Sequence, residues 1–447
     1  MSNTPHNNHD VQIFENLLLI KDGYDQCGES ALAIKGDKIF AVGTTDELRH
    51  RFPTALRQNY QGYLAMPGLV NAHSHATMSF FRGLGHDHTS EVASDKSMIE
   101  DFFFPAEKKL TAELTAPLAY SYLVDGLKSG VTCFADAYFF ADGVGKAAEK
   151  IGLKAAIGEH HADLGGPLPA GKDLWEKTKK MIESWPFSDD IKPVVYAHAA
   201  DTMSKDFLTE LAHFARSYDL PFHMHLSQTK GERDRVKQRE GVSPVEFAES
   251  CRALHPRSLL VHLLSADSND YKIIADSGAI AGLTPTSEII YESAPSVRDI
   301  WDANIPFVLG TDCAASCDGA NVLAEGKLLA LLLAIQGRRP SGLLQKIFES
   351  LTSIPNQLFG FPMTGKISEG YQADIVFLKE DISVVPRSDL LVNLFYSFQS
   401  RHVKHVMING NWVLRDGELV QVAEQELLAE YQAALKEVKK RTGLPIL

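Results

Sequence analysis

The feature that most constrains the fold of this chain is a regular alternation of short apolar runs with longer amphipathic segments, from about Ala65 to Gly360. The apolar runs are rich in β-branched residues and predict strands, while intervening segments such as residues 110–130 and 204–219 predict helices. Eight β-then-α units in one uninterrupted series are typical of a (β/α)8 (TIM) barrel, an α/β fold. The predicted strands cover residues 64–73, 131–138, 153–160, 192–199, 221–227, 258–264, 278–285 and 305–312.

The segments on either side of the barrel have a different pattern, because they predict short strands separated by turn residues rather than β-then-α units. Neither flank has enough strands to be stable alone, so we expect the two to pair in one small composite β-sandwich. The C-terminal segment is charged and amphipathic and predicts a helix with a solvated face. The expected division is residues 1–66 with 367–423 for the sandwich, 67–366 for the barrel and 424–447 for the C-terminal helix and tail.

Composition narrows the class of partner. The 447 residues carry a net charge of −13, which argues against nucleic acid and anionic membranes because both require a basic face. No apolar run approaches the roughly 20 residues that span a bilayer, and the N-terminus lacks the layout of a signal peptide. Five cysteines are too few and too scattered for a disulfide framework, so we expect a cytoplasmic protein that acts on a small molecule.

Imidazole and carboxylate side chains recur at the C-terminal ends of the predicted strands. These ends converge on one face of a barrel, where catalytic groups collect. A lone buried histidine is usually a core residue whose hydrogen bonds are satisfied, and this interpretation suits His161 and His223. His223 is also expected to support the site from behind. The set as a whole is better explained by metal binding; its members are His73 and His75 on the first strand, His198 on the fourth, His225 on the fifth, His262 on the sixth and Asp312 on the eighth.

The spacing of these residues predicts how one ion could be held. Residues i and i+2 of a strand point the same way, so His73 and His75 both face the barrel axis. His225 and Asp312 complete a shell that suits one divalent ion, with Zn²⁺ as the first expectation and Fe²⁺ as the alternative. An open position would hold a water of lowered pKa, with Asp312 able to take its proton and His262 able to orient it.

Several separated motifs then carry a family resemblance. "MPGLVNAHSH", "HMHLSQT", "LLVHLL" and "LGTDCAAS" resemble, in this order, the motif series of the amidohydrolase superfamily. More narrowly, they are similar to its branch of methylthioadenosine/S-adenosylhomocysteine deaminases and triazine hydrolases. The segments "GKISEGYQADIVFL" and "VMINGNWVLRDG" resemble the C-terminal half of that family's composite β-sandwich, so the likeness covers nearly the whole chain.

The resemblance implies roles for individual residues. It makes His73, His75, His225 and Asp312 the metal ligands and His262 the catalytic histidine beside the attacking water. It matches Glu107, in "FFFPAEKKLT", with a glutamate that binds ribose hydroxyls, and His198 with a substrate-contacting histidine. Helix capping would explain Glu107 about as well when that residue is taken alone. The resemblance also suggests a homo-oligomer.

The chain departs from the family at one position that matters for the chemistry. The fifth-strand motif ordinarily reads His-x-x-Glu, and here Gln228 takes the place of a glutamate that shuttles a proton to the ring of the substrate. Its place after a predicted ligand makes Gln228 an expected site residue that contacts the substrate. An amide can donate a hydrogen bond there but cannot transfer that proton. Either the substrate needs no ring protonation, or another acid such as Glu232 or Glu288 substitutes, or the protein hydrolyses poorly and mainly binds. Glu288 stands where the family usually has asparagine, which makes it a candidate substrate contact.

We therefore expect a metal-dependent aminohydrolase that removes ammonia from an adenine-nucleoside-like substrate. The alternative enzyme is a triazine-type hydrolase that displaces a halide, a thioether or an amine. The alternative from another class is a non-catalytic binding scaffold, which the retention of every metal ligand disfavours.

Overall fold

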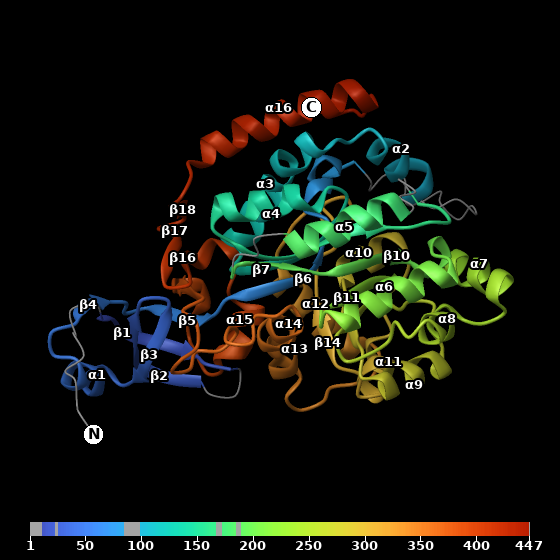
Figure 1. Cartoon of the computed structure of the whole chain (residues 1–447). Coiled ribbons are helices and arrows are strands. Elements are labelled where there is room, and N and C mark those ends of the chain that lie inside the picture. Colours follow the sequence, from blue (N-terminus) through green and yellow to red (C-terminus); the bar gives the residue numbers. More distant parts are fainter. Residues whose placement is uncertain (1–10, 23–25, 85–98, 167–171, 185–188, 447) are drawn as a thin grey trace.

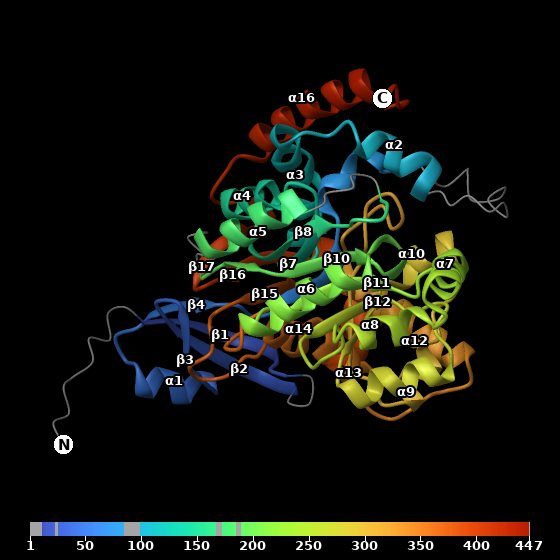
Figure 2. The same cartoon turned by 45° about the vertical axis from the view of Figure 1, so that its right-hand side comes forward.

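The computed structural model describes residues 11–22, 26–84, 99–166, 172–184 and 189–446 (Figure 1). It has two sheets of nine strands each, one mixed and one parallel, and helices surround the parallel sheet (Figures 1 and 2). None of the helices in these ranges is long and apolar enough to cross a bilayer.

The parallel sheet confirms the predicted barrel. Its eight main strands follow one another in chain order around the ring. The short strand β9 (Ile191–Pro193) pairs in parallel with β8, the third of them. The eight strands are β6 (Leu69–Ser74), β7 (Val131–Tyr138), β8 (Lys154–His161), β10 (Val195–Ala199), β11 (Phe222–Leu226), β12 (Ser258–His262), β13 (Ile280–Leu283) and β14 (Phe307–Leu309).

Helices follow these strands and form the outer layer, where their apolar faces bury the outward-pointing strand residues in one large cluster. Several helices begin where the sequence offers a capping side chain, as at Ser204, Ser243 and Asp267, each of which accepts a hydrogen bond from a first-turn backbone N–H. The helices of this layer are α3 (Ala112–Lys128), α4 (Ala141–Ile151), α5 (Lys172–Ser184), α6 (Lys205–Ser217), α7 (Lys230–Glu240), α8 (Pro244–Ser250), α9 (Ser268–Ser277), α10 (Pro285–Tyr291), α11 (Val297–Asp302), α12 (Val322–Ile335), α13 (Leu343–Leu351), α14 (Ser353–Leu358) and α15 (Leu390–Tyr396).

The barrel closes where β14 meets β6. The backbone N–H groups of Thr311 and Asp312 donate to the carbonyl of His73 at 3.2 and 3.0 Å, and Ser74 forms a parallel bridge with Asp312. A Cβ atom at Gly310 would lie only 2.6 Å from backbone atoms of His73, so only glycine allows this approach. Closure therefore brings two predicted metal ligands together.

The mixed sheet unites both flanks of the barrel, in the strand order β18-β17-β16-β15-β5-β1-β2-β3, with β4 paired to β1. The rings of Phe14 and Trp412 lie 5.8 Å apart although their strands are four positions apart, so the sheet curls around its own apolar cluster. Its elements are β1 (Val11–Ile20), β2 (Gln26–Lys35), β3 (Lys38–Gly43), α1 (Thr45–Arg51), β4 (Leu56–Asn59), β5 (Tyr63–Pro67), β15 (Ile375–Lys379), β16 (Val403–Ile408), β17 (Asn411–Arg415) and β18 (Glu418–Leu419).

The C-terminal helix, α16 (Glu424–Thr442), lies beside α3 and near α2 (Phe104–Glu107), as both views show (Figures 1 and 2). Ala434 and Val438 are buried in a cluster with Phe81 and Phe103, and the hydroxyl of Tyr431 donates to the Ser79 carbonyl at 3.3 Å. The helix is thus exposed to solvent on one side only, and its other side packs against Phe81 and Phe103 near the mouth of the barrel.

Candidate active site

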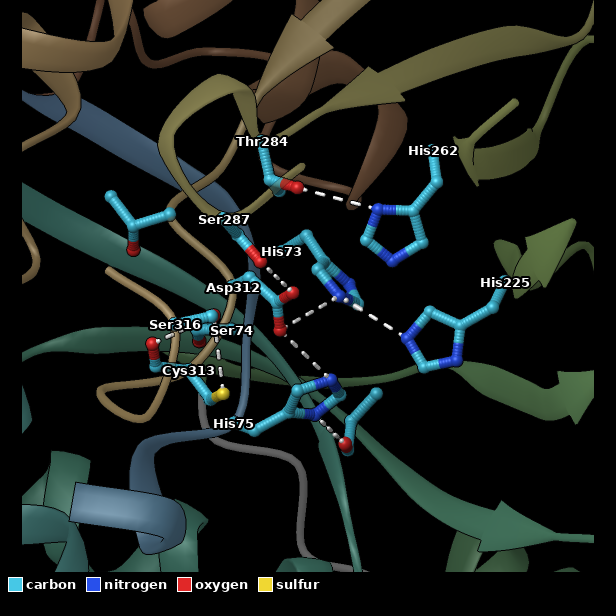
Figure 3. A network of polar contacts seen from close by, with 12 residues as sticks. His73, Ser74, His75, His225, His262, Thr284, Ser287, Asp312, Cys313 and Ser316 are labelled. Atoms are coloured by element: carbon cyan, nitrogen blue, oxygen red, sulfur yellow. Dashed lines mark hydrogen bonds and ion pairs between the residues drawn. The ribbon is translucent and has the colours of Figure 1, made fainter. Parts of the chain in front are cut away.

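Three histidines and one aspartate meet at the C-terminal end of the barrel (Figure 3). The Nε2 atoms of His73, in β6, and of His75, the first residue after β6, lie 3.8 and 3.5 Å from Oδ1 of Asp312, which follows β14. The Nε2 atom of His225, from β11, lies 3.3 Å from Nε2 of His73. Donor atoms from three separate strands therefore surround one point.

The first strand needs an irregularity to present its histidines. Val70 and Ala72 pack in the cluster inside the barrel, so strict alternation would direct His73 outward. The register of β6 against β7 shifts between Asn71 and Ser74, which is the signature of a bulge. Both His73 and His75 can therefore face the interior.

Hydrogen bonds select the nitrogen that each ring presents. Nδ1 of His75 lies 2.6 Å from the carbonyl of Ala137 and must donate to it, which leaves the lone pair on Nε2. Nδ1 of His73 lies 2.9 Å from Nε2 of His223. His223, expected from the sequence in the core or behind the site, therefore supports the predicted ligand His73. Burial, with neighbouring imidazoles, holds the pKa of His73 and of His225 well below the ordinary value, and both rings are neutral at pH 7.

Asp312 has one carboxylate oxygen committed and one available. Oδ2 accepts a hydrogen bond from the hydroxyl of Ser287 at 2.6 Å, and Oδ1 faces His73 and His75. Its backbone has a φ of 62°, a left-handed conformation that aspartate tolerates better than most residues. This turn of the chain aims the carboxylate into the barrel.

The residues fit a metal ion by their chemistry. Two overlapping groups have ligand atoms within 4.8 Å of one another, one of His73, His75 and Asp312 and the other of His73, His225 and His262. Imidazoles with one carboxylate are a donor set that suits Zn²⁺.

His262 lies beside this cluster at the end of β12. Val261 points into the barrel, and a φ of 82° at His262 turns the next side chain inward as well. Its ring stacks on that of His225, with centroids 5.2 Å apart. Nδ1 lies 3.4 Å from both the Thr284 hydroxyl and Oε1 of Glu288. The ring is thus held in place while it lines the pocket.

A pocket of about 750 Å³, open solvent included, extends from the cluster toward α2 and α10. Every residue predicted for substrate contact lines it: Glu107, His198, Gln228 and Glu288. Apolar rings, among them Phe103 and Phe104, form much of the rest of its wall. The pocket therefore combines an apolar surface with a few polar groups, as small-molecule sites usually do.

Glu107 is buried at the wall formed by α2. Its Oε1 accepts a hydrogen bond from the hydroxyl of Tyr138 at 2.6 Å. Burial raises the pKa of Glu107 to about 7, an effect that the Tyr138 hydrogen bond partly offsets. The capping interpretation is wrong, because a buried carboxyl group that lines a pocket does not cap a solvated helix.

Gln228 and Glu232 have different surroundings. Gln228 lines the pocket, whereas the carboxylate of Glu232 accepts hydrogen bonds from the backbone N–H groups of Ser227 at 3.0 Å and Gln228 at 2.7 Å. Burial, reinforced by Asp201, raises the pKa of Glu232 to about 8. Both of its oxygens hold the loop and it does not line the pocket, so it is a poor substitute for the missing acid.

The sequence did not identify several residues of the pocket. His160 lines it, and its buried Nε2 has no hydrogen-bond partner among the described residues. Its ring packs against His198, with centroids 4.4 Å apart. The alternation of β8 separates His160, which faces inward, from His161, which packs on Trp175 in the outer layer. This period-2 pattern is the signal that could have distinguished the two.

Comparisons with known proteins identify the family and the relatives to which this chain is similar. The sequence pattern described as the Amidohydrolase family matches residues 64–413, and that of a bacterial imidazolonepropionase-like composite domain matches residues 31–55. A 5′-deoxyadenosine deaminase of Methanopyrus kandleri is 31% identical over 366 residues, 81% of this chain and 84% of the relative. A 5-methylthioadenosine/S-adenosylhomocysteine deaminase of Syntrophus aciditrophicus is 27% identical over 444 residues, 97% of this chain and 96% of the relative.

Solved structures share the architecture. An adenosine deaminase of Xanthomonas campestris with bound zinc matches with a TM-score of 0.89 at 22% identity, over 96% of this chain and 98% of the other. An atrazine chlorohydrolase of Arthrobacter aurescens, complexed with zinc, matches with a TM-score of 0.83 at 19% identity, over 95% of this chain and 100% of the other. These likenesses show a common fold, a barrel with a composite domain.

Proposed function

The chain belongs to the amidohydrolase family, and we propose that it is a metal-dependent aminohydrolase that removes ammonia from an adenine-nucleoside-like substrate. The observation that carries the proposal is the convergence of His73, His75, His225 and Asp312 at the end of a pocket whose other wall holds Glu107. The chain is a hydrolase of C–N bonds other than peptide bonds, so the scaffold alternative is set aside.

His73, His75, His225 and Asp312 would hold the ion. When bound, the ion supplies a nucleophile near neutral pH, because it lowers the pKa of water from about 15.7 to about 7. The carboxylate of Asp312, oriented by Ser287, accepts the proton of the attacking water. The ring of His262, fixed by Thr284, orients that water or polarises the carbon under attack.

The rest of the pocket would bind the nucleoside. Glu107 presents a carboxylate that can accept hydrogen bonds from two ribose hydroxyls, with Tyr138 fixing its orientation. Phe103 and Phe104 offer apolar surface to the base and to an uncharged 5′ group. His198, whose Nδ1 lies 3.0 Å from the Thr202 hydroxyl, would contact the base.

The triazine alternative fits less well. Relatives that align over most of the chain at 27–31% identity are named nucleoside deaminases, whereas the chlorohydrolase shares the fold at 19% identity. A triazine has no ribose, so it would give the buried carboxylate of Glu107 no hydrogen-bond partner beyond Tyr138.

Finer features belong to the same proposal. We propose Zn²⁺ as the ion, and the zinc-bound structural neighbour supports this choice. We also propose the predicted division of the chain into a composite β-sandwich, a barrel and a C-terminal helix. Exposed apolar side chains on α12 and α15, such as Ile335 and Tyr396, support a homo-oligomer. The four cysteines whose side chains the structure describes are free thiols, which supports a reducing cytoplasm.

A substrate panel tests the proposal. We expect ammonia release from adenosine, 5′-deoxyadenosine, methylthioadenosine or S-adenosylhomocysteine, and kcat/KM at least roughly 10²-fold lower for triazines, because only nucleosides fill the polar wall at Glu107. The purified, zinc-supplemented protein is assayed for ammonia and for halide. Faster turnover of triazines than of every nucleoside would favour the alternative enzyme.

The Glu107→Gln variant should lose the preference for ribose. We expect the ratio of kcat/KM for a ribonucleoside over its 2′,3′-dideoxy analogue to fall by roughly 10-fold or more, since a charged acceptor becomes neutral. The pKa of Glu107 is raised to about 7, so this carboxyl is ionised above pH 7 and protonated below it. The wild-type ratio should therefore be larger at pH 8 than at pH 6, while the variant shows no such change. Glu249→Gln, on the exposed side of α8, is the matched control; an unchanged ratio in Glu107→Gln would reject ribose binding.

A further inference from the structure

Glu288 is a buried carboxylate of the pocket to which the mechanism above gives no chemical step. We propose that Glu288 carries a proton from the attacking water to the substrate, the task that Gln228 at the end of β11 cannot perform. The inference rests on the proposed deaminase function, because hydrolytic removal of ammonia requires that water protons reach nitrogen atoms of the substrate.

The hydrogen bonds of Glu288 leave one oxygen available. The residue is only 2% exposed and lines the pocket. Oε1 accepts from the backbone N–H and the hydroxyl of Thr284, at 3.1 and 3.3 Å. Oε2 is buried and has no hydrogen-bond partner among the described residues. Buried polar atoms rarely stay unpaired without a functional reason, and a substrate or water in the pocket would satisfy this one.

The position of Glu288 connects it with the reacting groups. It lies in α10, whose Ser287 donates to Oδ2 of Asp312 at 2.6 Å, while Oε1 of Glu288 lies 3.4 Å from Nδ1 of His262. The two successive residues thus contact the proposed base and the proposed water-orienting histidine. The helix is itself fixed by Glu325, which accepts from the backbone N–H and the hydroxyl of Thr286 at 2.9 and 2.6 Å. A carboxylate in this place is held rigidly beside the site of attack.

Other carboxylates near the pocket suit the task less well. Glu232 uses both oxygens to hold the backbone of the β11 loop and does not line the pocket. Glu107 is bonded to Tyr138, and Asp312 to Ser287 and the metal-site histidines. Glu292 lines the pocket but lies just after α10 and is exposed, and within the described part of the chain it is linked to the cluster through His262 alone. Glu288 alone among these combines a free buried oxygen with contact to His262.

The proposed step conserves atoms and charge. The water oxygen forms a bond to the carbon that bears the amino group, and one O–H proton passes to Oε2 of Glu288 and then to the adjacent ring nitrogen. The second O–H proton passes through Asp312 to the amino group, the C–N bond breaks, and ammonia leaves as the carbonyl forms. Glu288 and Asp312 both end as the carboxylates they were at the start.

The first test is the Glu288→Gln variant of the full chain, loaded with zinc. We expect kcat for ammonia release to fall by at least roughly 10²-fold, as is typical when a proton-transferring group is lost. Zinc content, melting temperature and affinity for the deaminated product should stay close to wild type, because Gln keeps the shape and the acceptor of the side chain. Glu325→Gln is the matched control: it removes a buried carboxylate that fixes the same helix outside the pocket, and we expect kcat within roughly 10-fold of wild type.

The second test moves the carboxylate. The double variant Glu288→Gln/Gln228→Glu should recover at least roughly 10-fold of the lost kcat, since a carboxylate returns to the same pocket. Gln228→Glu alone changes a residue that lines the pocket, and it should not raise kcat by as much as 10-fold, because a proton carrier is already present.

Four outcomes overturn the inference: kcat of Glu288→Gln within about 5-fold of wild type, a loss in Glu325→Gln equal to that in Glu288→Gln, no recovery in the double variant, or a 10-fold gain in Gln228→Glu alone. In each of them a wild-type enzyme that releases ammonia leaves the proposed function standing. Failure of the wild type on every nucleoside would overturn both.

Discussion

The Asp312→Asn variant is expected to lose activity almost completely, with kcat/KM for ammonia release lowered by roughly 10⁴-fold. Two effects combine in this one side chain. Loss of a positioned general base typically costs 10²–10⁴-fold, and the amide is also a much weaker metal ligand than the carboxylate. Asn preserves the volume and can still interact with the Ser287 hydroxyl, so the fold should survive.

The measurement separates the two effects. Zinc content by elemental analysis and kcat/KM by ammonia release are determined on the same preparation, at saturating zinc. Asp276→Asn, an exposed position of α9, is the matched control and should behave as wild type. Turnover of Asp312→Asn above about 1% of wild type, with the ion bound, would show that another group takes the proton of the water.

The barrel could be predicted because its signal is repeated eight times. Each strand is a short apolar run between helical segments, and a closed parallel ring buries such runs on both faces. The predicted strand 64–73 nevertheless contains a boundary: β5 ends at Pro67 in the composite sheet and β6 begins at Leu69 in the barrel. Apolar periodicity cannot show that a continuous run passes from one sheet to another.

The side chains at the strand ends could be predicted by type more easily than by direction. His73 faces the interior only because of a bulge in β6, and His262 because its own φ is 82°. Both irregularities break the period-2 rule, and the surrounding fold has to stabilise them. Their places at the ends of predicted strands identify both residues as functional, and the i, i+2 spacing rightly pairs His73 with His75. Alternation counted from Ala72 and Val261, which pack inside the barrel, would nevertheless direct His73 and His262 outward.

Tertiary contacts decided the roles of the acidic residues. The sequence offers both Glu232 and Glu288 as substitute acids and distinguishes Glu288 only by its place where the family usually has asparagine. The structure commits Glu232 to two backbone N–H groups and leaves an oxygen of Glu288 buried without a partner among the described residues. The same holds for α16, where charge patterning predicted a solvated helix but could not show which residues of its apolar side pack near the pocket.

Removal of the ion is expected to abolish the activity reversibly. Prolonged treatment with a zinc chelator should lower ammonia release by at least roughly 10⁴-fold, since water without the ion keeps a pKa of about 15.7 rather than about 7. His73, His75, His225 and Asp312 lie within the folded barrel, and an ion that binds the native state but not the unfolded chain stabilises the native state. The melting temperature should therefore fall by several degrees on chelation, and one equivalent of Zn²⁺ should restore both the melting temperature and the rate.

The His225→Ala variant is the control for site specificity, because one added equivalent of Zn²⁺ should restore neither the melting temperature nor the rate. A chelated, metal-free protein that still deaminates nucleosides would contradict the assignment of the cluster as the metal site, whereas full restoration of His225→Ala would only exclude His225 from it.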